Sequence, residues 1–287
     1  MSIMDKLYEK VEERGNTCVG LDTSLDYIPP SIKIKFTNYE DMIFNFNKEI
    51  IDSTFDKVAC FKLQIAYYEA QGIEGLRAYS KTLKYIKEKD SLAIGDIKRG
   101  DIKDTAKMYA KAHFEGDLEC DFITLNPYMG MDSIEPYLPY IKKGDKGVFI
   151  LLRTSNKGAE DIQYIESKDG KRVYDIMGEK ISCMGREYIG EKGYSQIGAV
   201  VGCTHIEEGK DLREKLNNTF FLIPGYGAQG GRAEDVAIYL NKGNGGVVNS
   251  SRKIILAYKE HKGEDVGFYA RQEVMRMNDE IKNALNI

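Results

Sequence analysis

Eight short apolar runs recur along the chain, and they alternate with segments that have the apolar spacing of helices. The runs cover residues 17–22, 57–63, 92–97, 120–125, 147–152, 197–201, 219–223 and 246–248. Continuous apolar runs are typical of parallel strands that are covered on both faces. Strands that alternate with helices indicate an α/β fold, and eight such units in 287 residues favour a (β/α)8 TIM barrel over an open sheet.

Composition is uniform along the chain, without a linker between halves. We therefore expect one domain over residues 1–287, with an extra helix at each end. A hydrophobic fraction of 42% and a charged fraction of 30% are typical of soluble globular proteins. The net charge of −4 does not favour nucleic-acid binding, which requires a basic surface. No apolar run approaches the roughly 20 residues that cross a membrane, so we expect no membrane partner.

Cysteines and histidines are few and scattered. The five cysteines are widely spaced, no pair has the spacing of metal ligands, and the three histidines do not cluster. The N-terminal residues also lack the apolar segment of a signal peptide. We therefore expect a cytoplasmic protein without a metal site.

The third apolar run ends in an alternating series of charges. Asp96 and Lys98 are two residues apart, so a strand directs both side chains to the same face, and Gly100 permits a sharp turn before Asp101. Neighbouring opposite charges favour the ionised forms, so we expect Lys98 to be an ammonium that can donate a proton. The same residues also suit a solvated face, with Asp101 capping the next helix.

A barrel gathers the C-terminal ends of its strands into one mouth. The polar residues at the predicted strand ends are Asp22, Lys62, Asp96, Lys98, Asn126, Ser155, Gln229 and Arg252. The loop at 224–231 is rich in glycine, and Arg252 follows the eighth run. Because loops after strands 7 and 8 of barrels frequently bind phosphate, the pattern predicts a phosphate site there.

The remaining residues limit the chemistry. The strand ends supply no catalytic cysteine, no serine–histidine pair and no metal cluster. The expected chemistry is therefore proton transfer and electrostatic stabilisation on a small phosphorylated substrate. The long segment after the fifth run, residues 153–170, is expected to lack structure of its own and to act as a lid.

The segment from Asp96 to Thr105, with its Asp-x-Lys-x-x-Asp core, resembles the hallmark of the orotidine 5'-phosphate decarboxylase family. Segments 20–22, 61–62, 224–231 and 249–252 match that family in order and at corresponding strand ends. The Leu-Leu-Arg-Thr-Ser sequence that ends at Ser155 resembles the long bacterial branch. The resemblance covers nearly the whole chain.

The resemblance implies the decarboxylation of orotidine 5'-monophosphate (OMP) to uridine 5'-monophosphate (UMP). This reaction is the last step of de novo pyrimidine nucleotide synthesis, and no metal or organic cofactor is implied. By resemblance, Lys98 protonates C6 of the pyrimidine and Asp96 lies near the departing carboxylate. Lys62 supports the ribose and the charge network, and Asp22 holds a ribose hydroxyl.

Further substrate contacts are also implied by resemblance. Ser155 contacts the pyrimidine, with Thr154 as the alternative, and Asn126 lines the site. The phosphate is held by Gln229, Arg252 and amides of the loop that begins at Pro224 and includes Gly230. The residues that reach into the active site of a partner subunit, and so imply a homodimer, are Asp101, Ile102 and Thr105.

Two alternatives remain open on the sequence. One is a sugar-phosphate synthase or epimerase on the same barrel, which usually requires a divalent metal held by carboxylates and histidines. The other is a non-catalytic phosphate-binding barrel, because a fold does not determine a function. Activity in the presence of excess chelator distinguishes the first alternative, and turnover of OMP distinguishes the second.

Overall fold

The computed structural model describes residues 1–227, 230–261 and 263–286. Eight parallel strands close into a barrel in sequence order, because β1 pairs with both β2 and β8. The strands are β1 (Thr17–Gly20), β2 (Cys60–Gln64), β3 (Leu92–Arg99), β4 (Phe122–Leu125), β5 (Gly147–Arg153), β6 (Ser195–Val201), β7 (Thr219–Pro224) and β8 (Gly246–Ser250). The predicted (β/α)8 barrel is therefore confirmed.

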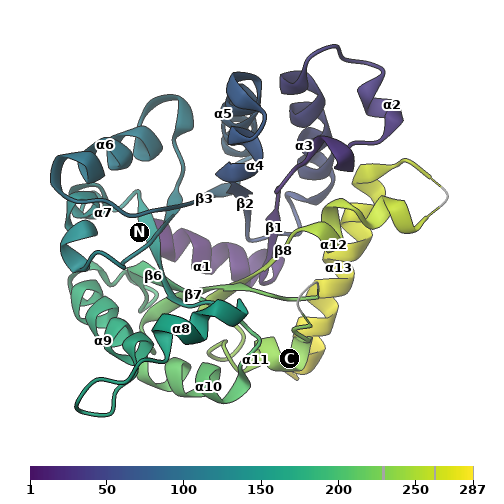
Figure 1. Cartoon of the computed structure of the whole chain (residues 1–287). Coiled ribbons are helices and arrows are strands. Elements are labelled where there is room, and N and C mark those ends of the chain that lie inside the picture. The colour runs from purple at the N-terminus through teal and green to yellow at the C-terminus, as the bar shows by residue number, and fades with distance from the viewer. Residues whose placement is uncertain (228–229, 262, 287) are drawn as a thin grey trace.

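Helices surround the barrel (Figure 1). They are α1 (Ile3–Arg14), α2 (Pro30–Lys33), α3 (Tyr39–Thr54), α4 (Ile65–Glu69), α5 (Gly72–Glu88), α6 (Lys103–Phe114), α7 (Leu138–Ile141), α8 (Glu160–Gln163), α9 (Val173–Gly185), α10 (Ile206–Lys215), α11 (Ala233–Ala237), α12 (Arg252–Ile255) and α13 (Val266–Ala284). The expected extra helices at the two ends are α1 and α13. In the described residues, no helix is long and apolar enough for a membrane span.

The N-terminal helix α1 closes one end of the barrel. A capping box formed by Ser2 and Asp5 satisfies the first amides of α1 and starts the helix. Its apolar face is buried in one cluster with side chains of the barrel interior, among them Phe122 and Phe149, whose ring centroids are 5.4 Å apart. This packing fills the end at which the strands begin and leaves the opposite end for a site.

A second apolar cluster lies between the strands and the outer helices. The buried residues of α5 include Ala78, Tyr79, Leu83 and Ile86, which recur at helical spacing and so form one face of that helix. Gly95 of β3 lies beneath this face, where a Cβ atom would stand 2.9 Å from the Tyr79 hydroxyl oxygen. A glycine there allows α5 to pack closely on β3.

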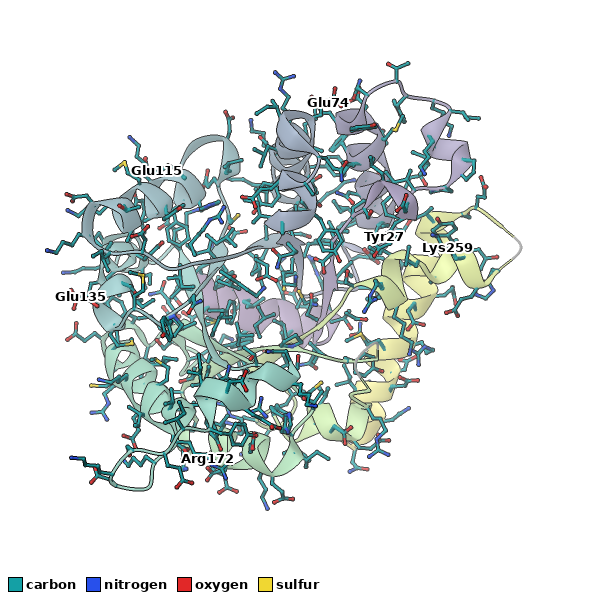
Figure 2. The ribbon with its side chains drawn as sticks, viewed as in Figure 1. Tyr27, Glu74, Glu115, Glu135, Arg172 and Lys259 are labelled. Atoms are coloured by element: carbon teal, nitrogen blue, oxygen red, sulfur yellow. The ribbon has the colours of Figure 1, made fainter. Side chains whose placement is uncertain are left out.

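One side of the barrel mouth is built by segments from opposite ends of the sequence. The Tyr258 hydroxyl donates to the carbonyl oxygen of Tyr27 at 2.6 Å, and Lys259 Nζ donates to the carbonyl oxygen of Asp26 at 3.0 Å. Figure 2 labels Tyr27 and Lys259 side by side. The segment between β1 and α3 is thus fixed against the chain that follows α12.

One expectation about the connections between strands needs correction, and two of the helical stretches are interrupted. The residues between β2 and β3 form two helices, because Gly72 adopts a positive φ of 64° that separates α4 from α5. The segment after β5 is not without structure, since it contains a 3-10 turn (Lys157–Ala159) and the short helix α8. The helix α9 ends at Gly185, where a 3-10 turn (Arg186–Tyr188) follows it.

Candidate active site

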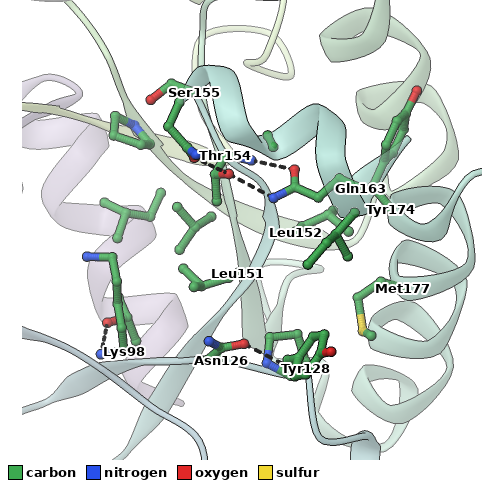
Figure 3. Close-up of a pocket in the computed structure, with 18 of the residues that line it drawn as sticks. Lys98, Asn126, Tyr128, Leu151, Leu152, Thr154, Ser155, Gln163, Tyr174 and Met177 are labelled. Carbon is green, nitrogen blue, oxygen red and sulfur yellow. Dashed lines mark hydrogen bonds between the residues drawn. The ribbon is translucent and has the colours of Figure 1, made fainter. Parts of the chain in front are cut away.

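A cavity of about 930 Å³ lies at the C-terminal ends of the strands. Seven residues that the sequence singled out line it: Lys62, Asp96, Lys98, Asn126, Thr154, Ser155 and Pro224. Figure 3 shows Lys98, Asn126 and Ser155 around this cavity. The remaining wall is largely apolar and includes Leu152 and Met177. The barrel therefore brings charged groups from β2 and β3 into a space that has apolar walls.

Asp96 is the centre of the charge cluster. Its carboxylate accepts a hydrogen bond from Lys62 Nζ at 2.9 Å and another from Lys98 Nζ at 2.5 Å. Lys62 Nζ also lies 3.3 Å from Asp22 Oδ1. Four residues from three neighbouring strand ends therefore form one continuous network of alternating charge.

Burial and charge act in opposite directions on these groups. Burial would raise the pKa of Asp96, but the ammonium charges of Lys62 and Lys98 outweigh it and hold that pKa below its ordinary value. Burial would lower the pKa of Lys62, but Asp22 and Asp96 outweigh it and raise that pKa above its ordinary value. Asp96 and Lys62 are therefore both ionised at neutral pH, despite exposures of only 6% and 4%.

Two positioning groups were missed by the sequence analysis. Thr124 on β4 accepts a hydrogen bond from the backbone N–H of Lys98 at 2.9 Å and donates to Asp96 Oδ1 at 2.8 Å. Gln64 Nε2 donates to Asp96 Oδ2 at 3.0 Å. The position of Thr124 on β4, two residues before Asn126 at the strand end, was an available signal, because alternate residues of an extended chain share a face.

Lys98 has an unusual backbone conformation. Its φ of 47° lies in the left-handed region, which non-glycine residues rarely adopt, and the β3–β4 register shifts between Gly95 and Arg99. Such strained positions persist where neighbours fix them and concentrate at functional sites. The hydrogen bond to Thr124 is one interaction that fixes this backbone.

The residues after β5 present Ser155 to the cavity. The Thr154 N–H donates to Gln163 Oε1 at 3.0 Å, and the Thr154 hydroxyl accepts from Gln163 Nε2 at 2.8 Å (Figure 3). The same hydroxyl donates to Asn156 Oδ1 at 2.7 Å. Because Thr154 is engaged within its own loop, Ser155 is the better placed of the two to contact a ligand.

The predicted phosphate end is only partly described. Gln229 lies outside the described residues. Gly230 has a positive φ of 88°, and its N–H donates to the carbonyl oxygen of Gly227 at 3.0 Å. An anion can therefore bind this amide only if it replaces or shares that hydrogen bond.

Arg252 is exposed at the first position of α12, and neither it nor Asp22 lines the cavity. Both lie at the same mouth, because the Ser251 hydroxyl donates to the carbonyl oxygen of Gly20 at 2.9 Å. Burial raises the pKa of Tyr67, the charge of Asp22 raises it further, and the charge of Arg252 lowers it. The charges of Asp22 and Arg252 therefore both act on the Tyr67 side chain.

The start of α6 lies outside the cavity of its own chain. Ile102 and Thr105 are exposed, and neither they nor Asp101 line that cavity. Within the described ranges, the Asp101 carboxylate accepts only the adjacent N–H of Ile102, at 2.8 Å, and the N-cap position of α6 is Ile102 without a side-chain cap. The structure therefore does not assign Asp101 the helix-capping role that the sequence left open.

The chain matches a family model described as the orotidine 5'-phosphate decarboxylase / HUMPS family over residues 15–264. The chain belongs to this family. Two curated relatives named orotidine 5'-phosphate decarboxylase, from Clostridium tetani and Clostridium perfringens (strain SM101), are 65% and 66% identical, and each match covers 99% of both chains. A solved structure of Leishmania donovani OMP decarboxylase is 27% identical with a TM-score of 0.77, and the match covers 100% of both chains.

Membership of the orotidine 5'-phosphate decarboxylase family confirms the resemblance inferred from the Asp96–Thr105 motif. It also confirms that the chain is an enzyme of the carboxy-lyase class. In the part of the chain that the structure describes, no group of three or more His, Cys, Asp or Glu residues is arranged to hold a metal ion.

Proposed function

We propose that the chain converts OMP to UMP and CO2, the last step of de novo pyrimidine nucleotide synthesis. The observation that carries this proposal is the Lys62–Asp96–Lys98 charge cluster on the wall of the cavity. The curated relatives support the same substrate, because they carry the name orotidine 5'-phosphate decarboxylase. The chain would act as one domain in the cytoplasm.

Proton transfer is the chemical task of Lys98. Cleavage of the bond between C6 and the carboxylate releases CO2 and leaves an electron pair on C6. That carbanion has no conjugated electron sink, so the enzyme must stabilise charge where it develops. The Lys98 ammonium supplies this charge and then its proton, which forms the new C6–H bond, and water afterwards reprotonates the amine.

Asp96 and Lys62 prepare the site for this step. Asp96 stays ionised because of the two lysines, so it orients the Lys98 ammonium through their 2.5 Å hydrogen bond. A substrate carboxylate near Asp96 would meet a like charge, which disfavours the bound substrate relative to the product. Lys62 balances this negative charge and lies between Asp96 and Asp22, where a ribose hydroxyl would bind.

Substrate binding uses the rest of the mouth. Ser155 would contact the pyrimidine and Asn126 would line the site, while Arg252, Gln229 and the amide of Gly230 would hold the phosphate. A guanidinium can give a phosphate two parallel hydrogen bonds. Phosphate binding is remote from C6, yet it lowers the barrier when it draws the loops over the ring. No metal or organic cofactor enters this scheme.

A homodimer with shared sites completes the proposal. Asp101, Ile102 and Thr105 stand at or near the start of α6, outside the cavity of their own chain. This placement supports their insertion into the site of a second subunit. Each active site would then combine Lys98 from one chain with Asp101 from the other.

The direct test is the loss of ultraviolet absorbance when purified protein is mixed with OMP and excess chelator. We expect turnover that the chelator does not reduce, because the proposed proton donor is Lys98. A sugar-phosphate synthase or epimerase would leave OMP unchanged, and a non-catalytic barrel would bind UMP without turnover. Either of these results would contradict the proposal.

A further inference from the structure

Arg153 is a buried charge with no role in the chemistry described above. It is the last residue of β5 and precedes Thr154 and Ser155, yet only 1% of its surface is exposed. A buried charge is tolerated only when it is paired and its donors are satisfied. The groups that pair with Arg153 therefore hold the end of β5 in place.

The Arg153 guanidinium joins three separate segments. Its Nε donates to Glu208 Oε2 on α10 at 2.7 Å, and one Nη donates to the Tyr164 hydroxyl after α8 at 2.7 Å. The other Nη donates to the carbonyl oxygen of Thr154. One side chain thus links β5, the segment after α8 and the helix of the next barrel unit.

Glu208 is the common acceptor of this cluster. Besides Arg153, its carboxylate accepts from the Tyr164 hydroxyl, and Arg172 Nη1 lies 3.5 Å away. The guanidinium groups of Arg153 and Arg172 lie 5.0 Å and 4.9 Å from the centroid of the Tyr164 ring. The segment between β5 and α9 is therefore attached to α10 near both of its ends.

The cluster reaches the cavity through Thr154. Arg153 holds the Thr154 carbonyl, while Gln163 holds its N–H and hydroxyl. Gly202, whose N–H donates to the Arg153 carbonyl oxygen at 2.8 Å, lies so close to Ser155 that a Cβ at Gly202 would be 2.8 Å from the Ser155 Cβ. The peptide that carries Ser155 is thus fixed from both sides.

We propose that Arg153, Glu208 and Tyr164 are positioning residues that set the base-contacting segment, residues 154–156, for the pyrimidine ring. This inference rests on the proposed function, because it assigns the base to that segment. Among the described residues, the hydrogen bonds of this network reach neither the phosphate loop, residues 224–231, nor the Lys62–Asp96–Lys98 cluster. Its loss should therefore weaken recognition of the base and leave recognition of the ribose phosphate intact.

The test compares two variants, Tyr164→Phe and Glu208→Gln, with the matched control Glu207→Gln, whose residue is exposed on the same helix. Binding of UMP and of ribose 5-phosphate, which lacks the base, is measured by calorimetry for each folded protein. We expect the Kd for UMP to rise about tenfold in both variants, with a matching rise in KM for OMP. The Kd for ribose 5-phosphate should not change, and the control should behave as wild type.

Two outcomes would overturn the proposal: UMP binding that equals wild type in both variants, or an equal loss of affinity for UMP and ribose 5-phosphate. If Glu208→Gln does not fold, the Tyr164→Phe variant alone tests the proposal. It should still fold, because the substitution removes only one oxygen from a half-buried ring. Wild-type turnover of OMP reports on the proposed function separately. Its absence would reject that function, whereas the ratio of variant to wild-type affinities tests the positioning role.

Discussion

At the scale of single residues, one hydroxyl connects the two groups on which the chemistry depends. Thr124 donates to Asp96 and accepts the backbone N–H of Lys98, whose left-handed φ of 47° needs support. Thr124 therefore fixes the direction from which the ammonium faces the cavity. It also helps to keep the buried Asp96 carboxylate ionised, because hydrogen bonds to a charged form favour that form.

Replacement of Thr124 by valine keeps the shape and removes this hydroxyl. We expect Thr124→Val to lower kcat by about 10- to 150-fold, since a hydrogen bond to a charged group contributes about 1.5–3 kcal/mol. Thr124→Ser should restore most of that loss, because it keeps the oxygen. Steady-state kinetics with OMP check this, and wild-type kcat in the valine variant would refute the role.

The sequence predicted the charged residues of the site better than their supports. Asp96, Lys98 and Lys62 stand at the ends of apolar runs, where a barrel must place them at one mouth. Thr124 and Gln64 have no charge that draws attention, and their roles depend on contacts between strands. Neighbouring-strand contacts follow from register, which the apolar pattern alone does not specify.

At the scale of elements, the strands were predictable and the connections were less so. Strands of a closed parallel barrel are buried on both faces, so each reads as a short apolar run. The segment after β5 is polar, so its sequence suggests a loop without structure. It is held in place by the pairing of Arg153 with Glu208, which is 55 residues further along the chain and cannot be seen in the local pattern. The sequence predicts α1 as a helix, but its position across one end of the barrel depends on where its apolar face packs.

At the scale of the whole molecule, the exposed start of α6 makes each chain an incomplete enzyme in our proposal. We expect Lys98→Ala and Asp101→Ala homodimers to be inactive. After subunit exchange, a mixture should recover about a quarter of wild-type activity, because half of the dimers are heterodimers and each has one intact site.

Kinetic assays of OMP turnover after mixing check this sharing. The control is a mixture of Lys98→Ala with wild type that carries a tag, which shows by co-purification that subunits exchange. Exchange without any recovery of activity would mean that Lys98 and Asp101 do not meet across an interface.

The proposed chemistry depends most on one group at the mouth of the barrel, the Lys98 ammonium as the source of the proton for C6. The most direct measurement is OMP turnover by Lys98→Ala, together with the affinity of that variant for UMP. We expect turnover below detection while the Kd for UMP stays within about tenfold of wild type, since the lost interaction acts mainly in the transition state. A Lys98→Ala variant that decarboxylates OMP with a kcat near that of wild type would show that Lys98 is not the proton donor.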